Sequence, residues 1–267
     1  MNEIKNYYKI IKFPFRAIHI LLAQFGINLL KFKKIIYIPK FFIDLIKYIK
    51  LNGKINYLLP IIGQHIEDSG DITPHYFYQD MIVASYIYQN NPIKHVDVGS
   101  RLDGFVSNIG SFRAIEVFDI RNNKINFKNI KFTKMDLNNI NHELENYTDS
   151  LSCLHTIEHL GLGRYGDAID PNGHQKAFNN LVKILKNNGL LYISFPIAQK
   201  TRTIFNSERR FHPRDILQWS DQLQLKKFDY INDSADIFYD VNLLEFNPHQ
   251  LLNGCGIYTF KKLNKIF

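Results

Sequence analysis

Between Lys94 and Phe195 short apolar runs alternate with segments of helical spacing, and this alternation constrains the fold more than any other feature. The runs that predict strands are residues 94–98, 114–120, 130–135, 151–154 and 190–195. Such a pattern is typical of parallel strands, because each intervening segment carries the chain back across the sheet. We therefore predict an α/β fold, with a mostly parallel sheet that has helices on both faces.

The two ends of this region carry their own signals. Thr73-Pro74 is typical of a helix start and predicts a helix over residues 75–88. The helix that follows Asp170-Pro171 is predicted to end at residues 187–189, where Gly189 can supply a left-handed cap. A predicted helix at 214–223 and predicted strands at 225–231 and 255–261 complete the chain. The long irregular connection between the last two strands favours antiparallel pairing at this end of the sheet.

The N-terminal segment differs from the rest of the chain in charge. Residues 1–60 hold eleven Lys and Arg against two acidic residues, whereas the remainder holds 22 basic and 23 acidic residues. Residues 16–30 and 41–51 both have the periodicity of amphipathic helices. We predict a basic, amphipathic helical segment over residues 1–72, followed by the α/β domain over residues 73–267.

Residues 1–58 have three alternative roles. They could form a helical cap on the main domain, lie on an anionic membrane surface, or contact nucleic acid. No nucleic-acid-binding motif is present, so we do not expect a nucleic-acid partner. The apolar stretch 17–30 is too short to span a membrane, and no signal-peptide cleavage site follows it. With Cys153 and Cys255 in apolar runs, as expected for buried reduced thiols, we expect a cytoplasmic protein, with peripheral contact at the inner membrane face as an option.

Acidic residues stand at the ends of the first three predicted strands. Asp97 and Gly99 follow the first strand within HVDVGSRLDGF, Asp119 ends the second and Asp136 ends the third. In open α/β sheets, ligands bind outside the carboxyl ends of the strands. Asp119 lies near the spacing expected for an acidic residue that binds a ribose. Together these residues predict a nucleoside-binding edge.

The fourth predicted strand ends in a polar cluster and a glycine-rich loop, DSLSCLHTIEHLGLGRYGD. His155, Glu158 and His159 are candidate catalytic residues, because His and Glu can be tuned to exchange protons near neutral pH. The alternative is that they only hold neighbouring loops by hydrogen bonds. HTIEH also fits the H-x-x-E-H motif of inverted zinc metallopeptidases, which needs both histidines on a helix. The preceding strand and following glycines argue against such a helix, and we expect no metal.

These motifs resemble the class I S-adenosylmethionine-dependent methyltransferase fold, a Rossmann-like sheet with an antiparallel end. More narrowly, HVDVGSRLDGF, SLSCLHTIEHLGLGRYGD and LKNNGLLYISFPI resemble a bacterial family of methyltransferase-like proteins catalogued as a domain of unknown function, over residues 74–211. The resemblance implies S-adenosylmethionine as cofactor, with its methionine part near Asp97 and Gly99, its ribose at Asp119 and its adenine near Asp136. The implied cofactor-binding residues are Asp97, Gly99, Ser100, Arg101, Gly104, Asp119 and Asp136.

The loop after the first strand departs from the superfamily pattern Asp-x-Gly-x-Gly-x-Gly. Arg101 and Asp103 fill the second and third glycine positions, and Gly104 comes one residue late. Their side chains could block the cofactor or re-route the loop. A non-catalytic binding module with this fold is therefore the main alternative. A nicotinamide-dependent oxidoreductase shares the architecture, but its GxGxxG motif is absent.

The loop after the fifth predicted strand, IAQKTRTIFNSERRFHPRD, is rich in arginine. Arginine side chains suit phosphate or carboxylate groups, so an anionic acceptor such as a phosphorylated or acidic sugar is expected; a solvated basic loop is the alternative. The candidate substrate-binding residues are Arg164, Tyr165, Arg202, Arg209, Arg210 and His212. The resemblance implies methyl transfer to a small or glycan-type acceptor, in surface-polysaccharide biosynthesis.

Overall fold

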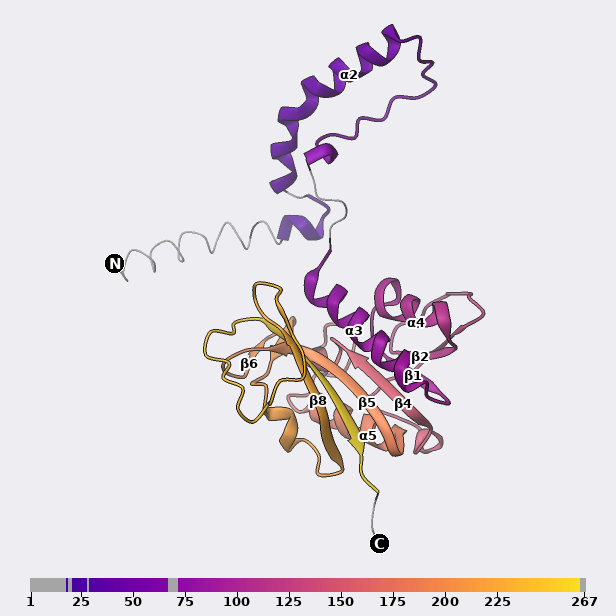
Figure 1. Cartoon of the computed structure of the whole chain (residues 1–267), viewed down its shortest axis with the longest axis vertical. Coiled ribbons are helices and arrows are strands. Elements are labelled where there is room, and N and C mark those ends of the chain that lie inside the picture. Colours follow the sequence, from indigo (N-terminus) through magenta and orange to yellow (C-terminus); the bar gives the residue numbers. More distant parts are fainter. Residues whose placement is uncertain (1–17, 19–20, 28, 67–71, 265–267) are drawn as a thin grey trace, which may run out of the picture. The chain divides into compact units, whose positions relative to one another are not determined.

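The chain divides into two compact units, residues 1–71 and 72–267. The computed structural model describes residues 18, 21–27, 29–66 and 72–264. In the first unit a 3-10 helix, Leu29–Tyr37, leads into α2, Ile38–Lys50 (Figure 1). Of the predicted amphipathic stretch 16–30, residues 18 and 21–24 are α-helical and residues 29–30 begin the 3-10 helix, whereas residues 16, 17, 19, 20 and 28 lie outside the described residues. No described helix is both long enough and apolar enough to cross a membrane.

The second unit contains an eight-stranded sheet in the order β3-β2-β1-β4-β5-β10-β8-β9 (Figure 1). Its strands are β1 His95–Val98, β2 Ile115–Asp119, β3 Ile130–Lys134, β4 Thr148–Leu154, β5 Leu185–Ile197, β8 Leu223–Ile231, β9 Ile237–Phe238 and β10 Gly254–Lys262. The first five strands pair in parallel, and β10 lies antiparallel to both β5 and β8. The predicted fold, with its antiparallel C-terminal end, is confirmed.

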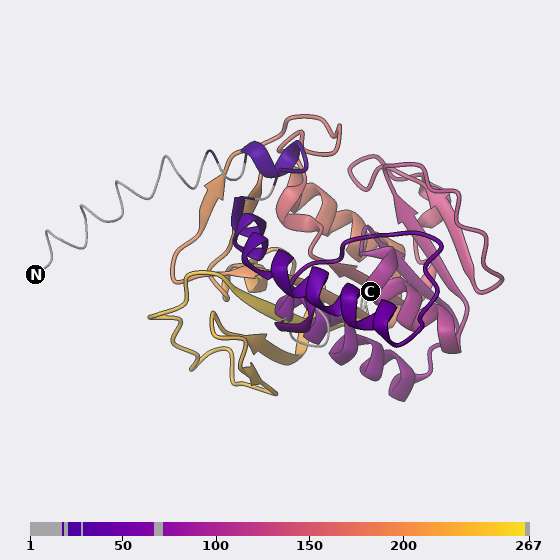
Figure 2. The ribbon, with the colours of Figure 1, turned by 90° about the horizontal axis from the view of Figure 1, so that it is seen from above.

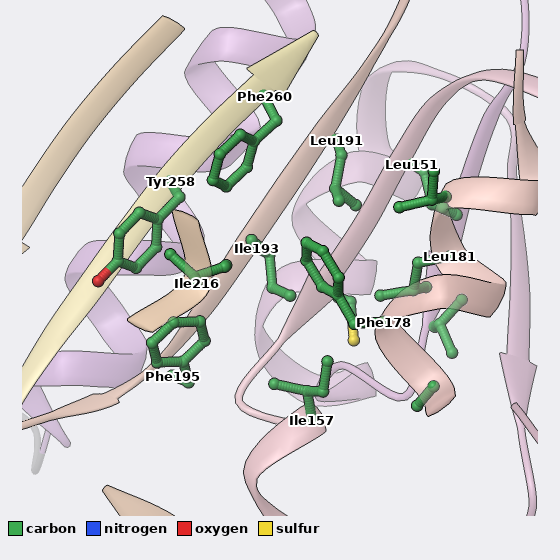
Figure 3. Close-up of a cluster of buried hydrophobic side chains, with 14 of the residues drawn as sticks. Leu151, Ile157, Phe178, Leu181, Leu191, Ile193, Phe195, Ile216, Tyr258 and Phe260 are labelled. Carbon is green, nitrogen blue, oxygen red and sulfur yellow. The ribbon is translucent and has the colours of Figure 1, made fainter. Parts of the chain in front are cut away.

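Helices cover both faces of the sheet. Successive side chains of a strand point to opposite faces, so strands that are apolar on both sides need cover on both. The helices are α3 Pro74–Asn90, a π-helical turn Leu102–Val106 that continues as α4 Ser107–Phe112, and α5 Gly173–Ile184. Figure 2 shows α5 and α3 on opposite sides of the sheet. On the α5 side, Phe178 and Leu181 pack towards Leu191 and Ile193 of β5 (Figure 3), whereas Tyr192 joins the core under α3 and α4.

The end of α5 differs from the sequence-based expectation. The helix ends at Ile184, and β5 begins at once, so Gly189 is not its cap. The last helical carbonyl groups bind distant partners instead: Tyr147 N donates to the Ile184 carbonyl, and the buried Lys262 ammonium donates to the Val182 carbonyl at 2.7 Å. Tertiary contacts therefore satisfy carbonyl groups that an isolated helix leaves to a glycine cap.

The segment after β5 also differs from its prediction. Residues 202–210 form a hairpin of β6 Arg202–Ile204 and β7 Glu208–Arg210, where an irregular loop was expected. The predicted helix at 214–223 is reduced to a 3-10 turn over Asp215–Gln218. The hairpin brings arginine-rich sequence back against the exit of β4, where Arg209 donates to the Leu160 carbonyl.

Candidate functional site

The carboxyl ends of β1 to β4 meet at one cavity, because parallel strands all end on the same edge of the sheet. The cavity encloses about 540 Å³ of empty space, including its opening to solvent. Its lining comes from four strand exits: Val98 and Gly99, Phe118 to Arg121, Met135 to Leu137, and His155, Thr156, His159 and Leu160. Tyr165 and Asp167 of the glycine-rich loop complete it.

A second cavity, of about 930 Å³, opens beside the first. The residues that line both are Gly99, Asp119, Arg121, His155, His159 and Tyr165. The second cavity extends to Tyr76 of α3 and to the arginines 101 and 164. The fold thus provides two adjoining spaces, one along the strand exits and one beside the β1 loop.

Asp97, at the end of β1, is fully buried and lines neither cavity. Its carboxylate accepts hydrogen bonds from the Ser100 backbone N–H at 3.0 Å, from Ser100 Oγ at 2.6 Å and from Ser152 Oγ at 2.6 Å. Burial disfavours the charged form and raises the pKa of Asp97 to about 6, against the opposing effect of these bonds. In the structure Asp97 organises the β1 exit from inside.

Gly99 lines both cavities, and its backbone has the positive φ of +73° that favours glycine. A Cβ atom at this position would lie 2.5 Å from Thr156 Cγ2. The chain therefore passes so closely by the β4 exit that only glycine fits there without strain, which leaves the backbone open to the cavity.

The altered glycine loop, residues 99–104, runs directly into the π-helical turn Leu102–Val106. Arg101 and Asp103 pair with each other, with Arg101 Nε 3.2 Å from Asp103 Oδ1, and both line the second cavity and not the first. Gly104 lies against Asp80, whose Oδ2 would be 2.3 Å from an added Cβ, and it lines neither cavity. Ser100 lines the second cavity and accepts a hydrogen bond from the Leu154 N–H. The substituted side chains thus leave the first cavity open.

The acidic residues after β2 and β3 face the first cavity. Asp119 lines both cavities, and its two oxygens are held by Arg121. Asp136 lines the first cavity, and its Oδ1 accepts a hydrogen bond from the Asn138 N–H at 2.9 Å. Of the three predicted acidic residues, the structure therefore brings two to the cavity.

Glu158 lies between two histidines at the exit of β4. The fully buried carboxylate has Oε1 3.0 Å from His155 Nδ1 and 3.6 Å from His159 Nε2. His159 Nδ1 donates to the Ser207 carbonyl at 2.6 Å, because a carbonyl oxygen can only accept. His155 has a positive φ of +49°. The three candidate catalytic side chains therefore form one contiguous array.

Within the described residues, His155 Nε2 and Glu158 Oε2 are buried and accept or donate no hydrogen bond of ordinary geometry, although the Cys255 side chain acts on the His155 ring. Buried polar groups in proteins nearly always have hydrogen-bond partners, so an unsatisfied Glu158 oxygen in this array suits a site that binds a polar ligand. Burial lowers the pKa of His155, whereas the Cys255 sulfur and the Glu158 carboxylate raise it, and the net shift is upward.

The zinc hydrolase alternative loses its geometric basis here. The helical part of HTIEH is a single 3-10 turn over Ile157–His159, and His155 precedes it in a left-handed conformation. Within residues 18–66 and 72–264, apart from the gaps at 19–20 and 28, no group of three or more His, Cys, Asp or Glu side chains could hold a metal ion.

The arginine-rich segment mostly binds the protein itself. Arg209 is 4% exposed and donates to the Leu160 carbonyl at 2.6 Å and to the Pro171 carbonyl at 3.2 Å. Arg210 pairs with Glu208, and both Arg202 and Arg210 donate to the Leu252 carbonyl. Together with His212, whose N–H donates to Thr201, these residues line neither cavity.

Arg164 and Tyr165 are the substrate-binding candidates that do reach a cavity. Both line the second cavity, and Arg164 donates to the Ser207 carbonyl at 3.1 Å. The Tyr165 ring lies 5.2 Å from the Arg164 guanidinium and 4.7 Å from that of Arg121. Tyr165 also meets the His159 ring edge-on at 5.5 Å. The GLGRYGD loop therefore links the histidine array to both arginines.

Sequence reasoning missed two residues of this site. The Tyr76 ring lies 4.7 Å from the His155 ring and 5.0 Å from the Arg101 guanidinium, yet it comes from α3, ahead of every motif. Arg121 carried a usable signal, because an arginine two residues after a strand-end aspartate can turn back and pair with it.

Solved structures with the same fold include several methyltransferases. The N-methyltransferase NodS from Bradyrhizobium japonicum WM9, solved with S-adenosylhomocysteine, matches with a TM-score of 0.51 and 11% identity, over 73% of this chain and 90% of that one. The 1,6-didemethyltoxoflavin N1-methyltransferase of Burkholderia thailandensis matches with a TM-score of 0.50 and 10% identity, over 74% and 94%. The chain has a class I methyltransferase fold.

Sequence comparisons add a family of undefined function. Residues 105–219, less than half of the chain, match the family described as "Caenorhabditis protein of unknown function, DUF268". This description names a Caenorhabditis family, where the sequence motifs predicted a bacterial one. A search of curated proteins finds no significant match. The identities to solved structures are so low that they establish the fold alone.

Proposed function

We propose that the protein is an S-adenosylmethionine-dependent methyltransferase that acts on a small, anionic acceptor of the glycan type, in surface-polysaccharide biosynthesis. The observation that carries the proposal is the buried His155–Glu158–His159 array, with its unsatisfied Glu158 oxygen, beside a cavity at the carboxyl edge of the sheet. The shared fold supports the reaction class. The acceptor class rests on the chemistry of the second cavity.

The first cavity suits the cofactor. It runs past the exits of β1, β2 and β3, where a close backbone approach at Gly99 and the carboxylates of Asp119 and Asp136 lie in chain order. Gly99 would adjoin the methionine part, Asp119 would bind the ribose hydroxyls, and Asp136 would lie near the adenine. When bound, S-adenosylmethionine supplies an electrophilic methyl group.

The histidine array can move a proton at a defined atom. Glu158 holds Nδ1 of His155, the Cys255 side chain also acts on the ring, and the ring lines both cavities, so this imidazole is the group we propose to take a proton from an acceptor hydroxyl or amine. His159 is held on its other side by the Ser207 carbonyl, which fixes its tautomer. A raised pKa keeps His155 largely protonated near neutral pH, so the base form, and with it turnover, should increase towards alkaline pH.

The second cavity suits an anionic acceptor. Arg164 lines it, and no carboxylate within the described residues pairs with this guanidinium. Tyr76 and Tyr165 add aromatic surface against which a ring can pack. A guanidinium that offers free donors beside aromatic rings fits a sugar ring that carries phosphate or carboxylate.

The first test is binding of S-adenosylhomocysteine, measured by isothermal titration and by the melting temperature. We expect saturable binding and a raised melting temperature, because a ligand of the native state stabilises it. Asp119→Ala should weaken binding, whereas Asp221→Ala, at an exposed aspartate that lines neither cavity, should not. Absence of binding and of any melting shift would reject the methyltransferase and favour a binding module without catalysis.

We also propose that residues 1–58 contact the inner, anionic face of a membrane. Phe42, Ile46 and Ile49 of α2 are each more than half exposed along one face, and Lys47 and Lys50 lie elsewhere on the helix. This placement would suit lipid-linked acceptors. Co-sedimentation with phosphatidylserine vesicles, but not with phosphatidylcholine vesicles, is the expected result, and Ile46→Asp should abolish it. Equal recovery with both vesicles would contradict the proposal.

A further inference from the structure

Asp119 and Arg121 form an ion pair within the first cavity. Asp119 Oδ1 accepts from the Arg121 backbone N–H at 2.8 Å and from its Nε at 3.0 Å, and Oδ2 accepts from Nη2 at 2.8 Å. The Asp119 side chain is 11% exposed and that of Arg121 is 57% exposed. The guanidinium therefore covers a nearly buried carboxylate from the solvent side, with one donor on each oxygen.

The same guanidinium also reaches the loop after β4. It lies 4.7 Å from the centre of the Tyr165 ring, a ring that Arg164 contacts as well. Arg121 lines both cavities, whereas Arg164 lines only the second. A modest rotation of the Arg121 side chain off Asp119 would keep it beside Tyr165 and leave it facing the space that Arg164 already lines.

We propose that Arg121 is a two-position switch that couples the two cavities. Before a nucleoside binds, the Arg121 guanidinium pairs with the Asp119 carboxylate. Ribose hydroxyls then take its place on Asp119. The released guanidinium joins Arg164 to bind the anionic group of the acceptor. This inference rests on the proposed function and deepens it, because it names the residue that links cofactor binding to acceptor binding. It makes an anion, phosphate or carboxylate, part of the acceptor.

The competition follows from the capacity of one carboxylate. A carboxylate offers about four acceptor positions, and Arg121 uses three of those of Asp119. A ribose that donates from two hydroxyls needs positions on which the guanidinium now lies. The displaced guanidinium then stands near Arg164 without a counter-charge, a cost that an anion removes. Linkage requires that anion and nucleoside each strengthen the binding of the other.

The test measures the affinity for S-adenosylhomocysteine by isothermal titration, in the presence and absence of inorganic phosphate at constant ionic strength. Arg121→Ala should bind S-adenosylhomocysteine about 3- to 10-fold more tightly than the wild type, because the competing ion pair is gone. Phosphate should tighten binding to the wild type and leave binding to Arg121→Ala unchanged. Lys124→Ala, which removes an exposed charge from the same loop, is the matched control and should behave as wild type.

The possible results distinguish failure of the switch, failure of the coupling to an anion and failure of the proposed function. Equal or weaker binding by Arg121→Ala, with normal binding by the wild type, overturns the switch and leaves the methyltransferase intact. Tighter binding by the variant without any effect of phosphate on the wild type overturns the coupling to an anion. Binding by neither protein overturns the proposed function, and the switch with it.

Discussion

Two buried carboxylates at neighbouring strand exits, Asp97 after β1 and Glu158 after β4, have opposite surroundings. Both are fully buried. Asp97 accepts three hydrogen bonds and lines neither cavity, so both of its carboxylate oxygens have partners within the protein. Glu158 contacts two histidines with one oxygen, and its other oxygen has no hydrogen-bond partner in the part of the chain that the structure describes.

The difference separates a carboxylate that stabilises the fold from the one that we propose to be functional. A satisfied buried charge fixes the geometry around it, and here it joins β1, its following turn and β4 through Ser100 and Ser152. An unsatisfied buried charge costs free energy that the fold must supply, so it persists best where a ligand or reaction needs it. Asp97 therefore supports the edge of the sheet, and Glu158 is the candidate for chemistry there.

The sharpest way to break this comparison is Glu158→Gln. We expect turnover, measured as transfer of labelled methyl groups from S-adenosylmethionine to anionic sugars, to fall by about 100- to 10,000-fold, because His155 loses the partner that orients its ring and raises its basicity. Affinity for S-adenosylhomocysteine should change little, as Glu158 lines neither cavity. Glu145→Gln, at an exposed glutamate, is the control, and unchanged turnover in Glu158→Gln would refute the catalytic role.

Asp97→Ala should act on stability. Three donors from Ser100 and Ser152 lose their acceptor in a buried site, so the free energy of unfolding should fall by about 3–5 kcal/mol in urea denaturation. Asp97→Asn keeps the shape and part of the hydrogen bonding and should cost less. If Asp97→Ala unfolds at the wild-type urea concentration, the buried network is not what holds the β1 exit.

Asp80 offers a third buried carboxylate, with one hydrogen bond from Gln79, and a pH test. Burial raises its pKa to about 7 from an ordinary value near 3.8. Folding then favours the protonated acid, so the stability it contributes is complete below about pH 4 and is lost as pH rises towards 7. Asp80→Asn cannot ionise and should be about 2–4 kcal/mol more stable than wild type at pH 8, but not at pH 4. Equal differences at both pH values would contradict this.

Arg209 and Arg164 show the same contrast between a side chain that stabilises the fold and one that is available to a ligand, with smaller expected effects. Arg209→Ala should lower the free energy of unfolding by about 2 kcal/mol, because its buried donors serve the Leu160 and Pro171 carbonyls. Arg164→Ala should change stability by less than about 0.5 kcal/mol and raise the KM for an anionic acceptor instead. Denaturation and initial-rate kinetics on both variants check this, and a KM effect confined to Arg209→Ala would reverse the assignment.

The sequence predicted the positions of the strands and the mostly parallel sheet well, because apolar runs and the turns between them are local signals. The parallel strands β1 to β5 and the antiparallel β10 lie where apolar runs placed them. It failed where a local signal competed with a distant partner. Gly189 predicted the end of α5, but the helix ends at Ile184. The carbonyl groups of Ile184 and Val182 accept hydrogen bonds from Tyr147 and Lys262 instead.

The candidate site was predictable in outline and not in detail. The motif DSLSCLHTIEHLGLGRYGD did bring His155, Glu158 and His159 into contact, since a tight turn keeps neighbours together. The arginine-rich segment was expected to face an acceptor, but its hairpin turns Arg209 inwards onto backbone carbonyls. The sequence shows that arginines are present in this segment, but it does not predict which of them bond to backbone carbonyl groups and which remain available to a ligand.

The sequence alone determined the class of fold and the edge at which polar side chains gather, because periodicity and strand ends are local properties. Only the tertiary structure decided which of those side chains are satisfied. Ser152 closes the network of Asp97, Ser207 orients His159, and Tyr76 packs on His155, and all three come from distant parts of the chain. Hydrogen-bond satisfaction depends on these long-range partners, and it is what distinguishes the supporting residues of this edge from the candidate catalytic ones.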